Sequence, residues 1–63
     1  MNQNLIAAAN QLREAGNATI RAILALENEG DKFKGTIVAL KLQAGDSFAA
    51  VARLEEAMTQ SGA

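Results

Sequence analysis

Apolar residues recur every three or four positions along two long stretches of the chain. The first stripe begins at Leu5 and ends at Leu26, and the second begins at Phe33 and ends at Met58. This spacing puts each stripe on one face of an α-helix, so the pattern predicts two long amphipathic helices. The stripes consist of Leu5, Ala9, Leu12, Gly16, Thr19, Ile23 and Leu26, and of Phe33, Ile37, Leu40, Ala44, Ser47, Val51, Leu54 and Met58.

The segment Glu29-Gly30-Asp31 separates the two stripes and predicts a turn. Gly30 can adopt the left-handed conformation that ends a helix, and Asp31 can cap the next one. Asn2 or Asn4 can cap the first helix in the same way. We therefore expect a single helical domain over residues 1–63, with a helix over about 4–28, a turn at 29–31, a helix over about 32–59 and a frayed tail at 60–63.

Two further places contain residues that can end a helix. They are Gly16-Asn17 and Gly45-Asp46-Ser47, where a glycine precedes a residue that can cap a new helix. The apolar spacing continues across both without a change of phase, which favours two continuous helices, in which the glycines allow a kink. The alternative is a compact monomer of three or four short helices, with loops at these two places.

Folding the chain back at Gly30 predicts an antiparallel hairpin with a definite register. Gly16 then lies near Ala44 and Gly45, and Thr19 lies near Gln43. Small residues would thus meet at the middle of the hairpin, where the two helix backbones approach closely.

A second apolar set lies beside the two stripes and suggests association. A two-helix seam uses one stripe per helix, whereas a bundle needs a wider apolar face. A chain of 63 residues is also marginal alone, because it buries only about 60% of its unfolded surface. We therefore expect an all-α antiparallel hairpin that associates into a four-helix bundle or a larger helical homo-oligomer. The expected interface residues are Ile6, Ile20, Leu24, Val38, Leu42 and Phe48.

The residue inventory argues against catalysis. The chain has no His, Cys, Tyr or Trp, so we expect no enzyme, no cofactor and no metal site. Glu55 and Glu56 are neighbours on a helix and face different directions, so they cannot form a catalytic pair. Neither a signal peptide nor a membrane-length apolar segment is evident, and a bacterial or phage cytoplasm is the expected location.

Six cations balance seven acidic residues, for a net charge of −1. Such a balance does not draw the chain to nucleic acid or to acidic lipid. Arg21, Lys41 and Arg53 are nevertheless candidates for binding a small anion, because guanidinium and ammonium groups bind phosphate well.

Three resemblances bear on function. The hairpin pattern resembles plasmid copy-number regulators of the repressor-of-primer type, which are short helical hairpins that pair into four-helix bundles. The segment 42–45, followed by 48–53, resembles the last helix of phage sponge proteins that sequester cyclic nucleotides in anti-CBASS defence, although Asp46 and Ser47 are two extra residues. The spacing of Leu40, Gly45, Ser47, Val51 and Leu54 resembles that of a helix-turn-helix.

These observations favour a non-enzymatic homo-oligomer that binds an unidentified protein partner as a regulator or inhibitor. The resemblance to sponge proteins implies an alternative, an oligomer that sequesters a small anionic ligand such as a nucleotide signal. DNA binding is the third interpretation, and it is disfavoured by the net charge and by Glu55-Glu56 at the end of the supposed reading helix.

Overall fold

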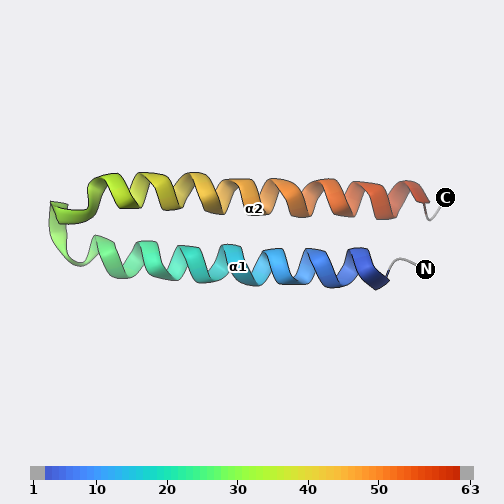
Figure 1. Ribbon diagram of the computed structural model, residues 1–63, viewed down its shortest axis with the longest axis horizontal. Helices are drawn as coiled ribbons and strands as arrows, with labels where there is room; N and C mark the ends of the chain where they lie inside the picture. Colours follow the sequence, from blue (N-terminus) through green and yellow to red (C-terminus); the bar gives the residue numbers. More distant parts are fainter. Residues whose placement is uncertain (1–2, 62–63) are drawn as a thin grey trace.

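The computed structural model describes residues 3–61 as two antiparallel helices joined by a short connection (Figure 1). Helix α1 is Gln3–Glu27, the 3-10 turn η1 is Gly30–Phe33, and helix α2 is Lys34–Ser61. The Cα atoms fill an elongated envelope of 48 × 14 × 11 Å. The prediction of an all-α helical hairpin is therefore confirmed.

Both helices run without interruption through the glycines at which a loop was conceivable. Gly16 lies inside α1, and Gly45 lies inside α2. A glycine inside a helix costs about 1 kcal/mol relative to alanine, which a helix of this length with one packed face can tolerate. Continuity excludes the compact monomer of three or four short helices. It also removes the turn that a helix-turn-helix would need at Gly45.

The connection is longer than the sequence predicts. Gly30 has a φ of +81°, the left-handed conformation expected of it. Asp31, however, lies inside η1, which has no side-chain capping hydrogen bond, so the prediction that Asp31 caps the second helix is wrong. After Gly30, the 3-10 turn contains three more residues, 31–33, and α2 begins at Lys34.

The outer ends of the helices also differ from the predicted bounds. Asn4 lies within α1, which begins at Gln3, so Asn4 does not cap that helix. Helix α2 continues through Gln60 to Ser61, past the predicted start of a frayed tail. Asn2 and the last two residues of the predicted tail lie outside the described part of the chain.

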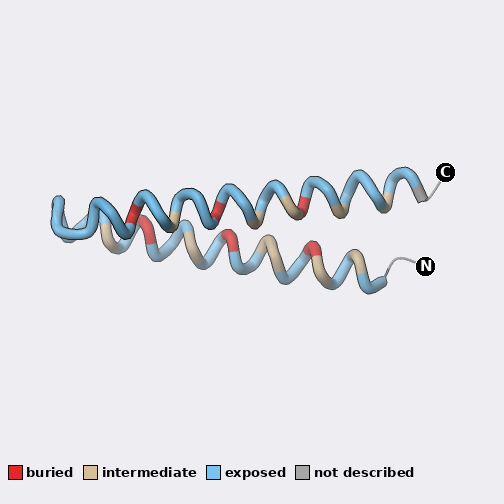
Figure 2. The backbone as a smooth tube through the Cα atoms, turned by 45° about the horizontal axis from the view of Figure 1, so that its top comes forward, coloured by how far each residue is buried: buried red, intermediate tan, exposed pale blue. Residues whose placement is uncertain are grey.

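The buried residues form a seam along the facing sides of the helices (Figure 2). Every predicted stripe residue except Phe33 is buried or half-buried. Phe33 is 38% exposed, because it ends the 3-10 turn and does not belong to the helix that carries the rest of the stripe. The fully buried residues are Ala9, Gly16 and Ile23 on α1 and Ile37, Ala44 and Val51 on α2.

The neighbours of Gly16 agree only in part with the predicted ones. Ala44 is buried on the seam side of α2, as its predicted place near Gly16 requires. Gly45 is exposed, and a Cβ placed on it would meet nothing within 4 Å, so the two glycines do not face each other. The ring of Phe48 covers Gly16 instead, because a Cβ placed on Gly16 would stand 2.7 Å from Cζ of Phe48.

Candidate functional site

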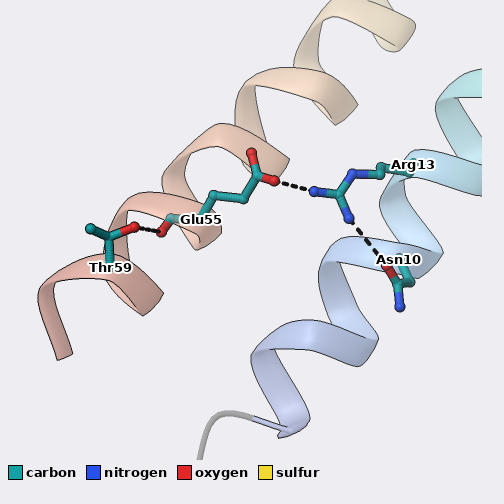
Figure 3. A network of polar contacts seen from close by, with 4 residues as sticks. All are labelled: Asn10, Arg13, Glu55 and Thr59. Atoms are coloured by element: carbon teal, nitrogen blue, oxygen red, sulfur yellow. Dashed lines mark hydrogen bonds and ion pairs between the residues drawn. The ribbon is translucent and has the colours of Figure 1, made fainter. Parts of the chain in front are cut away.

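One long side of the hairpin carries an ion pair between the helices. The guanidinium of Arg13 on α1 donates a hydrogen bond to a carboxylate oxygen of Glu55 on α2 (Figure 3). Its other terminal nitrogen donates to Oδ1 of Asn10 at 3.1 Å, which holds the guanidinium from within its own helix. The Thr59 hydroxyl donates to the carbonyl oxygen of Glu55 at 3.0 Å.

A second ion pair joins the helices nearer to the turn. Nζ of Lys41 on α2 lies 3.9 Å from Oε2 of Glu27 on α1. Both side chains are about half exposed, as are those of Arg13 and Glu55. Exposed pairs of this kind contribute little to stability. They do show which rows of the two helices lie side by side.

The rows follow from helix geometry. Seven residues make nearly two turns, so residues spaced by seven lie in one row along a helix. Arg13 and Glu27 belong to one such row on α1, with Ile20 midway between them. Lys41 and Glu55 belong to another on α2, with Phe48 midway between them. Since both ion pairs connect these rows, Ile20 and Phe48 lie on the same side of the hairpin, between the two pairs.

Five of the six predicted interface residues gather on this side. Leu24 is four residues after Ile20, and Val38 is three residues before Lys41, spacings that place them on adjoining faces of their helices. We call the apolar face the set Ile6, Ile20, Leu24, Val38 and Phe48, with exposed fractions from 36% to 58%. Leu42 is 68% exposed and comes two residues before the buried Ala44, so it points away from the seam, on the outer side of α2.

Phe48 belongs partly to the seam as well. Its ring covers Gly16 so closely that a side chain at position 16 would displace it, and Phe48 is the least exposed member of the apolar face. Gly16 thus creates the space that lets an aromatic ring of α2 lie against the backbone of α1. The outer surface of the ring remains accessible.

A hollow of about 410 Å³ lies at the turn end of the hairpin. Its charged lining residues are Glu27, Asp31, Lys34 and Lys41, two acids and two cations. Lys41 is paired with Glu27, and Nζ of Lys34 lies 4.0 Å from Oδ1 of Asp31. The carboxylates offset the positive charge that an anion would need, so the hollow is a poor site for a phosphate.

The three candidate anion-binding residues do not converge within one chain. Lys41 lines the hollow and is paired with Glu27. Arg53 is twelve residues further along the continuous α2, about 18 Å along the axis. Arg21 is exposed on α1, on the same helix as Glu27 but not in its row.

Sequence reasoning missed Arg13 and Glu55 as members of the site. The signal that identifies them is the seven-residue spacing of Arg13 from Ile6 and Ile20, and of Glu55 from Phe48. Within residues 3–61, no group of three or more acidic side chains is arranged to hold a metal ion. No helix in the same range is long and apolar enough to cross a membrane. No family model, curated protein or solved structure matches this chain.

Proposed function

We propose that this chain is a non-enzymatic, homo-oligomeric helical protein that acts by binding a protein partner, in a bacterial or phage cytoplasm. The observation that carries the proposal is the apolar face, five large side chains that the hairpin itself leaves at least partly uncovered. Exposed apolar side chains that gather on one side of a small protein usually mark an interaction site.

The surroundings of the apolar face support a protein as the ligand. Protein interfaces combine an apolar centre with a polar and charged rim. Here Ile20 and Phe48 lie at the centre, and the ion pairs Arg13–Glu55 and Glu27–Lys41 border them on either side. The chain's lack of His and Cys supports a binding role over a catalytic one.

Sequestration of a small anion is the weaker candidate. It would use Arg21, Lys41 and Arg53, which are separated in one chain and of which Lys41 already has a carboxylate partner. Two subunits would have to bring these cations together. No contact in the described residues favours that arrangement over protein binding.

The proposal can be tested by protein capture from a lysate of the source organism. Leu24→Glu/Val38→Glu adds two carboxylates to the apolar face at positions that are 56% and 58% exposed. The matched control is Ala25→Glu/Ala39→Glu, which adds the same charge to exposed alanines at neighbouring positions of the same helices. We expect the wild type and the control to retain the same host protein and the face variant to lose it. Equal capture by all three chains would refute the proposal.

A further inference from the structure

We propose that the occupant of the apolar face is a second copy of this chain, seated by a two-fold axis at the level of Ile20 and Phe48. The inference rests on the proposed function and deepens it, because it names the surface that forms the homo-oligomer; a host protein captured through this face would take the place of the second copy. It is carried by the arrangement of four charges around the apolar centre.

The charges alternate in sign around the centre of the face. On α1, the cation Arg13 and the anion Glu27 lie on either side of Ile20. On α2, the anion Glu55 lies beside Arg13 and the cation Lys41 lies beside Glu27. Each charge therefore has opposite charges as its neighbours, both across the helices and along them.

The four alternating charges of Arg13, Glu27, Lys41 and Glu55 form a pattern that is complementary to itself. A closed dimer places the same patch of both subunits face to face, so the patch must match its own rotated image. If the axis runs along the helices, Arg13 lies over the partner's Glu55. If the axis runs across them, Arg13 lies over the partner's Glu27. In both arrangements each cation meets an anion, and Lys41 is matched in the same way.

The size of the face suits a second hairpin. The broad side of the envelope measures 48 Å by 14 Å; this is roughly 700 Å² before side chains are added, close to the ~800 Å² that each partner buries in a standard interface. Two hairpins stacked in this way form a four-helix bundle.

The opposite side of the hairpin exposes less apolar surface. Its leucines are already half-buried in the hairpin; they are Leu5, Leu12, Leu26, Leu40 and Leu54. The next row outward holds Ala8, Ala15 and Ala22 on α1 and Gln43 and Ala50 on α2, small or polar side chains that give a second copy little to bury. A two-fold pairing is therefore expected on the apolar face.

The first test is the oligomeric state of the purified chain by sedimentation equilibrium and native mass spectrometry. We expect a dimer for the wild type and for Ala25→Glu/Ala39→Glu. Leu24→Glu/Val38→Glu should weaken dimerisation by about a hundred-fold or more, because it buries unpaired carboxylates. Circular dichroism reports whether each variant remains helical. A wild-type monomer at hundreds of micromolar, or a face variant that dimerises like the control, would overturn the inference.

The second test concerns the charges and does not depend on the apolar substitutions. The variant Arg13→Glu/Glu55→Arg/Glu27→Lys/Lys41→Glu exchanges both ion pairs and inverts every sign, so each chain keeps its internal pairs and remains complementary to itself. It should dimerise like the wild type. A mixed dimer with the wild type would oppose like charges in either two-fold arrangement.

Native mass spectrometry of an equal mixture of the wild type and the charge-exchanged variant measures how far each chain prefers its own kind. We expect mixed dimers well below the fraction of about one half that random pairing gives, and an increase of that fraction as salt is raised. Random mixing at low salt would show that the charges do not select the partner. A chain that stays monomeric while still capturing a host protein through the apolar face would overturn this inference and the homo-oligomeric part of the proposed function, and would leave the binding of a protein partner standing.

Discussion

The ring of Phe48 on α2 lies against Gly16 on α1, at a position where a Cβ would stand 2.7 Å from the ring. Gly16 is fully buried beneath it, while Phe48 keeps 36% of its surface exposed. One residue therefore connects the seam inside the hairpin to the apolar face outside it. The absence of a side chain at position 16 is what allows this.

The Gly16–Phe48 contact predicts a strong coupling between the two positions. Gly16→Ala improves helix propensity by about 1 kcal/mol but displaces the ring, so the free energy of unfolding should stay level or fall. In the Phe48→Ala background nothing opposes the methyl group, and the same substitution should raise stability by about 0.5–1 kcal/mol. Urea unfolding at a fixed chain concentration measures all four chains. An equal effect of Gly16→Ala in both backgrounds would contradict the contact.

The φ of +81° at Gly30 predicts that a side chain there strains the turn. Gly30→Ala should lower the free energy of unfolding by about 1–2 kcal/mol, the cost of the left-handed conformation for an alanine. Gly35→Ala is the control, because a Cβ at either glycine meets nothing within 4 Å and only Gly30 has a positive φ. Thermal unfolding followed by circular dichroism should show the control at or above wild-type stability. A similar loss of stability in both variants would show that the positive φ of Gly30 is not its cause.

Ile23 and Leu24 are neighbours in sequence with opposite environments, 6% and 56% exposed. Ile23→Ala should cost about 2–4 kcal/mol at any chain concentration, because it opens the seam. Leu24→Ala should cost little in dilute solution and more as the concentration rises, because its burial depends on association. Urea unfolding at two widely separated concentrations distinguishes them. A concentration-independent cost at Leu24 would mean that the apolar face stays uncovered.

The two ion pairs between the helices differ in geometry and should differ in strength. Arg13 donates a hydrogen bond to Glu55 and is held by Asn10, whereas Lys41 and Glu27 are 3.9 Å apart. Double-mutant cycles with glutamine should give a coupling of about 0.5–1 kcal/mol for the first pair and less for the second. Both couplings should shrink in high salt. A larger coupling for Lys41 and Glu27 would reverse this ranking.

The sequence alone determined the two helices and the residues that face the seam. Spacings of three and four residues fix one face of a helix whatever lies opposite, because 3.6 residues per turn is a property of the helix itself. That is why the stripes through Ile23 and Ile37 were predicted residue by residue, and why their unbroken phase at Gly16 and Gly45 correctly indicated continuous helices. The exposed apolar set was identified in the same way.

Only the tertiary structure decided the register and the pairing of rows. The structure places the ring of Phe48, and not Gly45, on Gly16. The ion pairs likewise depend on how the two helices are set against each other, since they join Arg13 to Glu55 and Glu27 to Lys41. Periodicity within one helix carries no information about its height against another, because that height is set by the turn and by the side chains that meet across the seam.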